Sequence, residues 1–141
     1  MQKFWLGVVS KEHVEKGVEW GICQVCHGKV APLKRMKKGD YLLYYSPKYS
    51  LNGAKKLQAF TAIGKMKDDE VYQVEQCPGF TPYRKDVEYY PAVRDCPLEN
   101  VRNHPDWKIY ASQIRYGHLE ISKDFFMYVF NQMRTDRAVE E

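Results

Sequence analysis

The sequence predicts an α+β fold in which a mixed sheet of five or six strands curls into a barrel, with short helices over its ends. Most apolar segments are short and rich in β-branched and aromatic residues, which is typical of strands. An amphipathic helical pattern is found near the C-terminus. The 141 residues, 44% of them hydrophobic, suffice for one domain over residues 1–141 with one substantial core.

The N-terminal half alternates strands with short helices. Residues 3–10 form an apolar run that predicts a buried strand. Ser10 is then a suitable N-cap for a helix, and Gly17 ends that predicted helix. A second helical turn begins at Pro32 and precedes a strand over residues 40–46. The first helix is therefore expected to start directly where the first strand ends.

The C-terminal half is more extended. Residues 57–66 and 71–76 predict a hairpin around a polar turn, and residues 80–93 predict an extended segment interrupted by prolines. A short strand is expected over residues 118–121. Ser122 then caps a helix whose apolar residues recur at helical spacing, so that one face packs on the sheet.

Positive charge is concentrated in the first part of the chain. Residues 1–85 carry 15 Lys and Arg against 8 Asp and Glu, whereas residues 86–141 carry 7 against 10. Lys and Arg neutralise phosphates and the 11 tyrosines offer rings that stack on bases, so this composition favours a nucleic-acid partner. A solvated basic surface without a ligand is the alternative. The candidate phosphate-binding residues are Lys29, Lys34, Arg35, Lys37 and Lys38.

Composition and motifs also exclude several classes of protein. No apolar run reaches the length of a membrane span, and none follows a basic leader, so a cytoplasmic protein with no membrane partner is expected. No Gly-rich phosphate loop, nucleophile elbow or paired-carboxylate pattern is present. We therefore expect a binding protein without a cofactor, and not an enzyme. The sequence does not predict an oligomeric state.

A Cys-x-x-Cys-His motif is formed by Cys23, Cys26 and His27. Covalent haem would require export and a second axial ligand, and zinc would require the isolated Cys77 and Cys96 to complete four ligands. The strand and helix order of a thioredoxin-like redox site is absent. We expect the cysteines to be small apolar residues or pocket walls, with no metal site. A metal or haem protein is the alternative.

Polar side chains gather near two strand ends. Ser10 and His13 lie where the first strand meets its helix, and the free backbone N–H groups of a helix start can bind an anion or a polar ligand edge. Tyr45 and Ser46 end a central strand. Each of these residues also has a purely structural interpretation, as a helix cap, a surface residue or a core residue.

Several segments resemble the EVE-domain family. They include Trp5-Leu-Gly-Val-Val-Ser10, Tyr44-Tyr-Ser-Pro47 and residues 24–29, 31–36, 60–64, 80–87, 115–117 and 124–125. The likeness follows nearly the whole chain in order. It implies a PUA-like fold, a small curled β-barrel with flanking helices, in the same group as the YTH, SRA and ASCH-type readers of modified bases.

The resemblance further implies a module that binds RNA or DNA and takes a modified base out of its strand into a pocket. Carried over by position, the pocket consists of Val9, Ser10, His13, Cys23, Gln24, Tyr45 and Ser46, with Tyr89 as an aromatic wall. Cys23 stands where adenine readers carry Trp, which argues against a simple copy of methyl-adenine recognition. A small-molecule or nucleotide-binding enzyme that uses the same pocket is the alternative.

Overall fold

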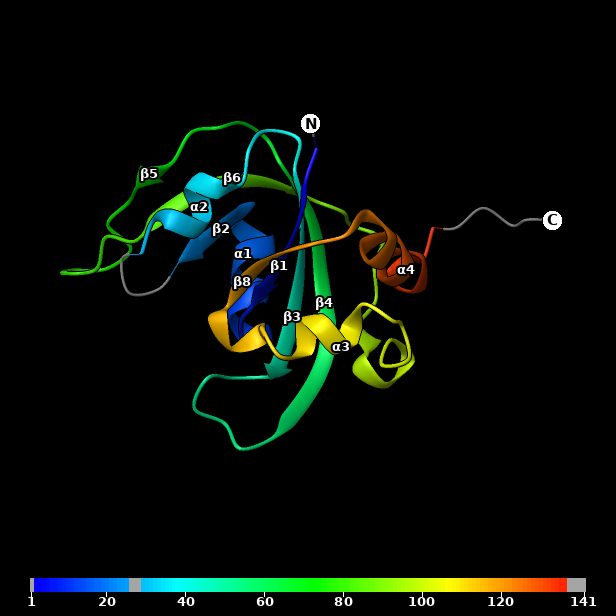
Figure 1. The fold of residues 1–141 in the computed structure, drawn as a ribbon. Coiled ribbons are helices and arrows are strands. Elements are labelled where there is room, and N and C mark those ends of the chain that lie inside the picture. Colours follow the sequence, from blue (N-terminus) through cyan, green and yellow to red (C-terminus); the bar gives the residue numbers. More distant parts are fainter. Residues whose placement is uncertain (1, 26–28, 137–141) are drawn as a thin grey trace.

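A long pair of antiparallel strands, β3 (Tyr41–Lys48) and β4 (Lys56–Met66), runs through the centre of the computed structural model (Figure 1). The structure describes residues 2–25 and 29–136. The other strands are β1 (Phe4–Val8), β2 (Ile22–Val25), β5 (Tyr72–Gln73), β6 (Tyr83–Tyr89), β7 (Cys96–Pro97) and β8 (His118–Ile121). The helices are α1 (Lys11–Trp20), α2 (Ala31–Arg35), α3 (Trp107–Ala111) and α4 (Lys123–Met133), with 3-10 turns at Leu98–Asn100 and Ile114–Tyr116.

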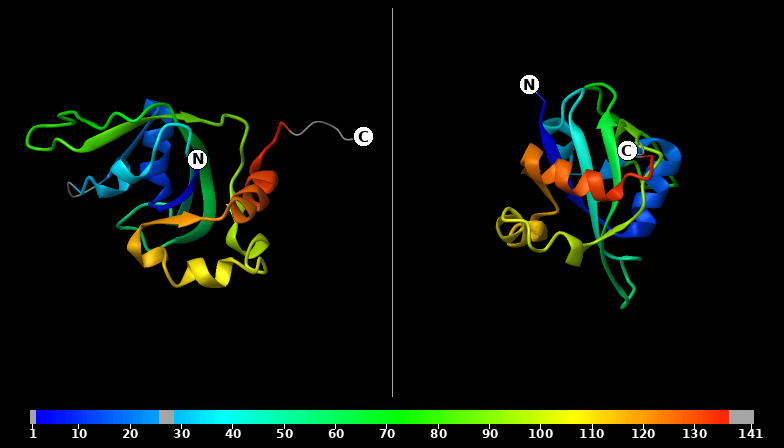
Figure 2. Two further views of the ribbon diagram at one scale, coloured as in Figure 1. Left: turned by 45° about the horizontal axis from the view of Figure 1, so that its top comes forward. Right: turned by 90° about the vertical axis from the view of Figure 1, so that its right-hand side faces the viewer.

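The strands form one mixed sheet. Over the described residues its order is β2-β6-β4-β3-β1-β8, with β5 paired to β6 and β7 paired to β4. β1 runs parallel to β3, whereas β8 runs antiparallel to β1. The sheet curls into a half-barrel, which Figure 2 shows from two further directions. The predicted α+β class and its curled mixed sheet are therefore confirmed, with eight strands instead of five or six.

Helices cover the central strands on two sides. α1 and α2 lie on one side of the β3–β4 pair, and α3 and α4 lie on the other (Figures 1 and 2). Successive residues of β3 alternate between the two cores: Leu42 and Tyr44 pack on the α1 side, and Leu43 and Tyr45 pack on the α4 side. This alternation decides which tyrosine faces the candidate site.

The predicted helix caps are confirmed. Ser10 accepts a hydrogen bond from the His13 backbone N–H at the start of α1, at 3.4 Å. Ser122 accepts one from the Phe125 N–H at the start of α4, at 3.0 Å. Pro32 lies in the first turn of α2, where its missing N–H has no cost. Within the described ranges, no helix has the length and apolar character that crossing a bilayer requires.

The predicted end of the first helix is wrong. α1 continues past Gly17 to Trp20 and ends at Gly21, whose φ of 68° lies in the left-handed region that suits a helix end. Gly17 serves another purpose, because a Cβ added there would lie 2.8 Å from the carbonyl oxygen of Ile22. The glycine thus lets α1 lie close to β2.

The expected hairpin of residues 57–66 and 71–76 is also wrong. β5 pairs with β6, whereas β4 pairs with β3, β6 and β7. The turn lies one segment later, where Cys77 and Phe80 form a bridge and Gly79 has a φ of 82°. The break that Pro78 and Gly79 mark in the sequence therefore reverses the chain between β5 and β6.

Candidate binding site at the β1–α1 junction

A cavity of about 500 Å³ lies where β1 ends and α1 begins, and we call it the junction cavity. β1, α1, β2, α2, β3 and the start of β8 all contribute to its wall. Its apolar lining consists of Gly7, Val8, Val9, Cys23, Pro32, Leu33, Met36, Leu42, Tyr44, Leu51 and Gly117. Its polar lining consists of Ser10, Glu12, His13, Lys16, Gln24, Lys29, Tyr116 and His118. Both the volume and the mixed lining fall within the usual range for small-ligand sites.

Five of the eight predicted pocket residues line this cavity, namely Val9, Ser10, His13, Cys23 and Gln24. Val9 and Ser10 follow β1 directly, and His13 lies in the first turn of α1. Cys23 and Gln24 belong to β2, which follows α1 after the close turn at residue 21. The strand–helix–strand path therefore brings residues that follow β1 together with residues of β2.

The structure does not bring Tyr45 or Ser46 to the junction cavity. Tyr45 is 1% exposed, and its ring packs on Phe60 in the core beneath α3 and α4. Ser46 is fully buried, and its hydroxyl shares a 2.8 Å hydrogen bond with that of Thr61. Because neighbouring strand residues point to opposite faces, the ring that faces α1 is that of Tyr44.

Tyr89 likewise lies outside the lining of the junction cavity. Its hydroxyl donates to the Ile22 carbonyl oxygen at 2.9 Å, and burial raises the pKa of the phenol. Its ring lies nearly parallel to that of Tyr44, with the ring centres 6.5 Å apart. Tyr89 therefore packs beside Tyr44, and it is Tyr44, 6% exposed, that lines the cavity.

His118 lines the cavity although no motif in the sequence selected it. Its ring stacks on Trp5, with ring centres 5.1 Å apart, and the Trp5 Nε1 donates to the buried Asp40 at 2.9 Å. Burial, reinforced by the charge of Arg35, lowers the pKa of His118 to about 4. The sequence places His118 only at the start of a predicted strand. It does not indicate that this strand pairs with β1 and so brings His118 to the cavity.

The tautomer of His118 follows from its neighbour. Nη2 of Arg35 lies 3.4 Å from Nδ1 of His118, and a guanidinium can only donate. Nδ1 therefore accepts, and Nε2 carries the hydrogen of the neutral ring. Nε2 is buried and has no hydrogen-bond partner in the part of the chain that the structure describes.

His13 is also uncharged near neutral pH. Burial lowers its pKa, a hydrogen bond with the Gln24 backbone opposes that shift, and the nearby charge of Lys16 reinforces it. The cationic groups of the lining are instead the exposed Lys16 and Lys29, with Glu12 also exposed beside them. The histidines thus offer neutral hydrogen-bonding groups, and the lysines place positive charge where solvent reaches.

The five predicted phosphate-binding residues Lys29, Lys34, Arg35, Lys37 and Lys38 are all exposed. Lys29 lines the junction cavity, and Arg35 contacts its wall through His118. Lys34 lies on α2, and Lys37 and Lys38 lie in the turn that follows it. These three residues do not line the cavity.

Comparison with known proteins identifies the family. The family model described as the EVE domain matches residues 3–132. The chain belongs to the EVE-domain family. A UPF0310 protein of Streptococcus sanguinis (strain SK36) is 71% identical over 136 residues, covering 96% of each chain. The UPF0310 protein YdcG of Bacillus subtilis (strain 168) is 43% identical over 136 residues, covering 92% of this chain and 91% of that protein.

Solved structures support the fold of this EVE-domain protein. The YTH domain of Zygosaccharomyces rouxii MRB1, solved in complex with N6-methyladenosine RNA, superposes with a TM-score of 0.60 at 16% identity. The match covers 92% of this chain and 85% of the YTH chain. The NMR structure of Rpa0253 from Rhodopseudomonas palustris gives a TM-score of 0.60 at 17% identity, covering 92% of each chain. These neighbours confirm the PUA-like architecture.

The cysteine motif falls partly outside the described residues, which do not include Cys26 and His27. Cys23 is 2% exposed, and burial raises the pKa of its thiol to about 12. Cys96 is buried in the core on the α4 side, and Cys77 is exposed. Near neutral pH the Cys23 thiol is therefore protonated, and its sulfur belongs to the wall of the junction cavity.

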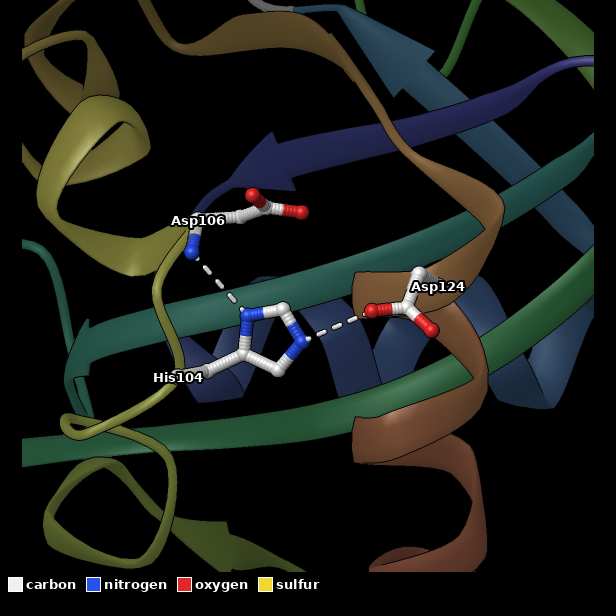
Figure 3. A group of neighbouring side chains, drawn as sticks. All are labelled: His104, Asp106 and Asp124. Atoms are coloured by element: carbon white, nitrogen blue, oxygen red, sulfur yellow. Dashed lines mark hydrogen bonds and ion pairs between the residues drawn. The ribbon is translucent and has the colours of Figure 1, made fainter.

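A separate cluster of metal-type ligands consists of His104, Asp106 and Asp124 (Figure 3). Nδ1 of His104 accepts the Asp106 backbone N–H at 3.0 Å, so its Nε2 carries the hydrogen and points to the Asp124 carboxylate, 3.3 Å away. A ligating histidine would instead donate through its second nitrogen. Ser122 also donates to the Asp106 carboxylate, at 2.8 Å. This network ties the start of α3 to the start of α4.

Proposed function

We propose that this EVE-domain protein is a nucleic-acid-binding module that holds one base, taken out of its strand, in the junction cavity. The observation that carries the proposal is the distribution of charge and aromatic surface in that cavity. Tyr44 and neutral imidazoles line its interior, and lysines lie at exposed positions of its lining. A neutral heteroaromatic base suits such an interior, and a phosphate backbone suits the lysines.

Hydrogen bonding supports the same ligand. Base edges carry ring nitrogens and carbonyl oxygens, which suit the neutral His118 ring in the cavity lining. His13 adds a second neutral ring that can donate or accept. The similarly folded YTH domain was solved with an N6-methyladenosine RNA, a ligand of the same chemical class. A modified base in RNA or DNA is thus the ligand that we propose.

We propose binding without catalysis. The Ser10 hydroxyl is used as the helix cap, where it accepts from a backbone N–H. The Cys23 thiol has its pKa raised to about 12 by burial, the opposite of what a nucleophile requires. Neither group is hydrogen-bonded to a histidine side chain within the described residues. Among the described residues, neither the Ser10 hydroxyl nor the Cys23 thiol is therefore activated as a nucleophile.

The test uses short RNA and DNA oligonucleotides, single- and double-stranded, with one central adenine, N6-methyladenine, cytosine or 5-methylcytosine. Binding is measured by fluorescence anisotropy for the parent, Tyr44→Phe and Tyr44→Leu. Loss of the ring in Tyr44→Leu should weaken the best oligonucleotide by about 5- to 150-fold, the usual value of one stacking contact. Tyr44→Phe keeps the ring and should bind within a few-fold of the parent. Thermal unfolding of each variant checks that it is folded.

Two outcomes would contradict the proposal. One is that the parent binds no member of the panel more tightly than random competitor nucleic acid. The other is that free nucleosides or mononucleotides bind as tightly as the oligonucleotides, which would favour a small-molecule or nucleotide-using enzyme. A further arm uses His13→Ala, which should reduce the preference between bases more than overall affinity, because phosphate contacts carry no sequence information.

A further inference from the structure

A second, smaller cavity of about 140 Å³ adjoins the junction cavity, and we call it the side pocket. Five residues line both cavities: His13, Lys16, Cys23, Gln24 and Tyr44. Five further residues line the side pocket but not the junction cavity: Gly17, Trp20, Ile22, Gln76 and Phe80. The two cavities therefore lie side by side, with Tyr44 and the first half of α1 as their common wall.

Trp20 leaves an aromatic surface exposed in the side pocket. Its side chain is 44% exposed, whereas Trp5 and Trp107 are each 5% exposed. The guanidinium of Arg84 lies over the Trp20 ring, 5.0 Å from its centre. Trp20 is the last residue of α1, directly before the turn at Gly21, so its position is set by the helix end. A tryptophan held in this way can stack on a planar ligand.

Two amides beside Trp20 have their orientation set by the same arginine. Nε of Arg84 donates to Oε1 of Gln24 at 2.7 Å, and Nη2 donates to Oε1 of Gln76 at 3.1 Å. Nε2 of Gln24 also donates to Oε1 of Gln76, at 3.0 Å. Both carbonyl oxygens are thus occupied, and Nε2 of Gln76 makes no hydrogen bond to a described residue. The pocket therefore presents amide donors, and a ligand edge with acceptors would complete it.

The size of the side pocket limits what fits. An apolar cavity of about 150 Å³ holds one benzene ring, so a pocket of this size suits a single six-membered ring. Lys16 lines both cavities, and its ammonium can reach an anion placed between two ligands. Two successive nucleotides of a strand have this arrangement: one planar base for each cavity and a phosphate between them.

We propose that the side pocket is a second nucleotide site, which holds the base next to the one in the junction cavity. This inference rests on the proposed function and specifies its substrate: a strand in which two successive bases are unpaired. The neighbouring base stacks on Trp20, its acceptor edge faces the Gln76 amide, and Lys16 binds the phosphate between the two bases. Recognition then depends on the sequence beside the modified base as well as on the base itself.

The experiment uses the panel oligonucleotide that the parent binds most tightly, together with two abasic forms of it. One form lacks the base on the 5′ side of the central position, and the other lacks the base on the 3′ side. For the parent, one of these abasic forms should bind about 5- to 150-fold more weakly, the loss of one stacking contact. Trp20→Ala should bind the intact and abasic forms equally well, while it still prefers the modified central base. Trp20→Phe should recover part of the sensitivity. Tyr128→Ala, which removes a 41% exposed ring from α4, should behave as the parent.

Fluorescence provides an independent readout. Trp20 is the most exposed of the three tryptophans, so a base that stacks on it should quench part of the parent's emission, and that part should be missing in Trp20→Ala. If Trp20→Ala keeps the full abasic penalty, or the parent shows none on either side, the side pocket is not a nucleotide site although the junction cavity still binds a base. If the parent binds no oligonucleotide, the proposed function fails and this inference fails with it.

Discussion

The ring of Tyr44 lies directly against the backbone of Gly7. The two residues are partners in the parallel register of β1 and β3. A Cβ added to Gly7 would lie 2.9 Å from Cε1 of Tyr44, closer than such atoms normally approach. Glycine at this position lets an aromatic side chain cover the neighbouring strand. Because Tyr44 lines both the junction cavity and the side pocket, this contact positions the wall that the two cavities share.

We expect Gly7→Ala to push the Tyr44 ring out of place. The free energy of unfolding, measured by urea denaturation, should fall by about 1–3 kcal/mol, the usual cost of overpacking a core. Oligonucleotide binding should weaken as well. In a Tyr44→Leu background the methyl group meets a smaller side chain, so the same substitution should cost less stability. An equal cost in both backgrounds would show that the strain arises elsewhere.

Salt dependence should separate the lysines of the cavity lining from the rest of the basic surface. The slope of log affinity against log salt reflects the number of phosphates contacted, at about −0.9 each for duplex DNA and about −0.7 for single strands. Lys16→Ala and Lys29→Ala should each make the slope shallower by about one such contact. Lys123→Ala should leave it unchanged, because Lys123 lies on α4, across the central strands from α1 and α2. A Lys123 effect as large as that of Lys16 would place the interface elsewhere.

The same titration can test the residues beyond the cavity. Lys34, Arg35, Lys37 and Lys38 are exposed on α2 and on the turn that follows it. If the strand continues over this surface, replacing all four by Ala should reduce the slope further than either single lysine variant. An unchanged slope would restrict the phosphate contacts to the cavity itself.

Local signals predicted much of the fold. The apolar run of β1, the serine caps and the amphipathic spacing of α4 each depend on near neighbours, and the structure contains all of them. Gly17 was misleading because a glycine inside a helix and one at its end look alike in a sequence, and only the packing of α1 on β2 distinguishes them. The pairing of β5 with β6 was likewise not predicted, because local sequence patterns do not determine which strands pair.

The candidate site was predictable only in part, and the reason lies in β3. Leu42 to Ser46 are all buried, so the usual alternation of apolar and polar residues is missing and does not tell which tyrosine faces α1. The glycine at position 7 was a usable signal for a ring on the opposing strand. His118 and Trp20 lie far apart in the sequence, and only the sheet order and the length of α1 bring them beside the cavities.

The cluster at His104 should behave as a structural network and not as a metal site. His104→Ala leaves the part-buried Asp106 N–H without its acceptor and should lower the free energy of unfolding by about 1–3 kcal/mol. His104→Asn, whose carbonyl oxygen can replace Nδ1, should cost less. Asp124→Asn should change stability by less than about 1 kcal/mol, because the carboxylate is exposed. Zinc that raises the unfolding temperature of the parent but not of His104→Ala would contradict this assignment.

His118 should make the folded state sensitive to acid. Its pKa is lowered from 6.5 to about 4 when the chain folds, mainly by burial and then by the charge of Arg35. Between these two values the unfolded chain binds more protons than the folded one, so the free energy of unfolding falls as the pH decreases through this window. The stabilisation is fully present above about pH 6.5. Its loss toward pH 4 should be on the order of 3 kcal/mol.

Two variants separate His118 from the carboxylates that titrate in the same range. His118→Asn has no titrating ring, so its stability should depend less on pH between 7 and 4 than that of the parent, whatever its absolute value. Arg35→Gln removes the smaller cause of the shift and should reduce the loss without abolishing it, since burial remains. An NMR titration of the imidazole provides the direct measurement. A midpoint near 6.5 would show that His118 is solvated, and its assignment as a buried neutral ring would then be wrong.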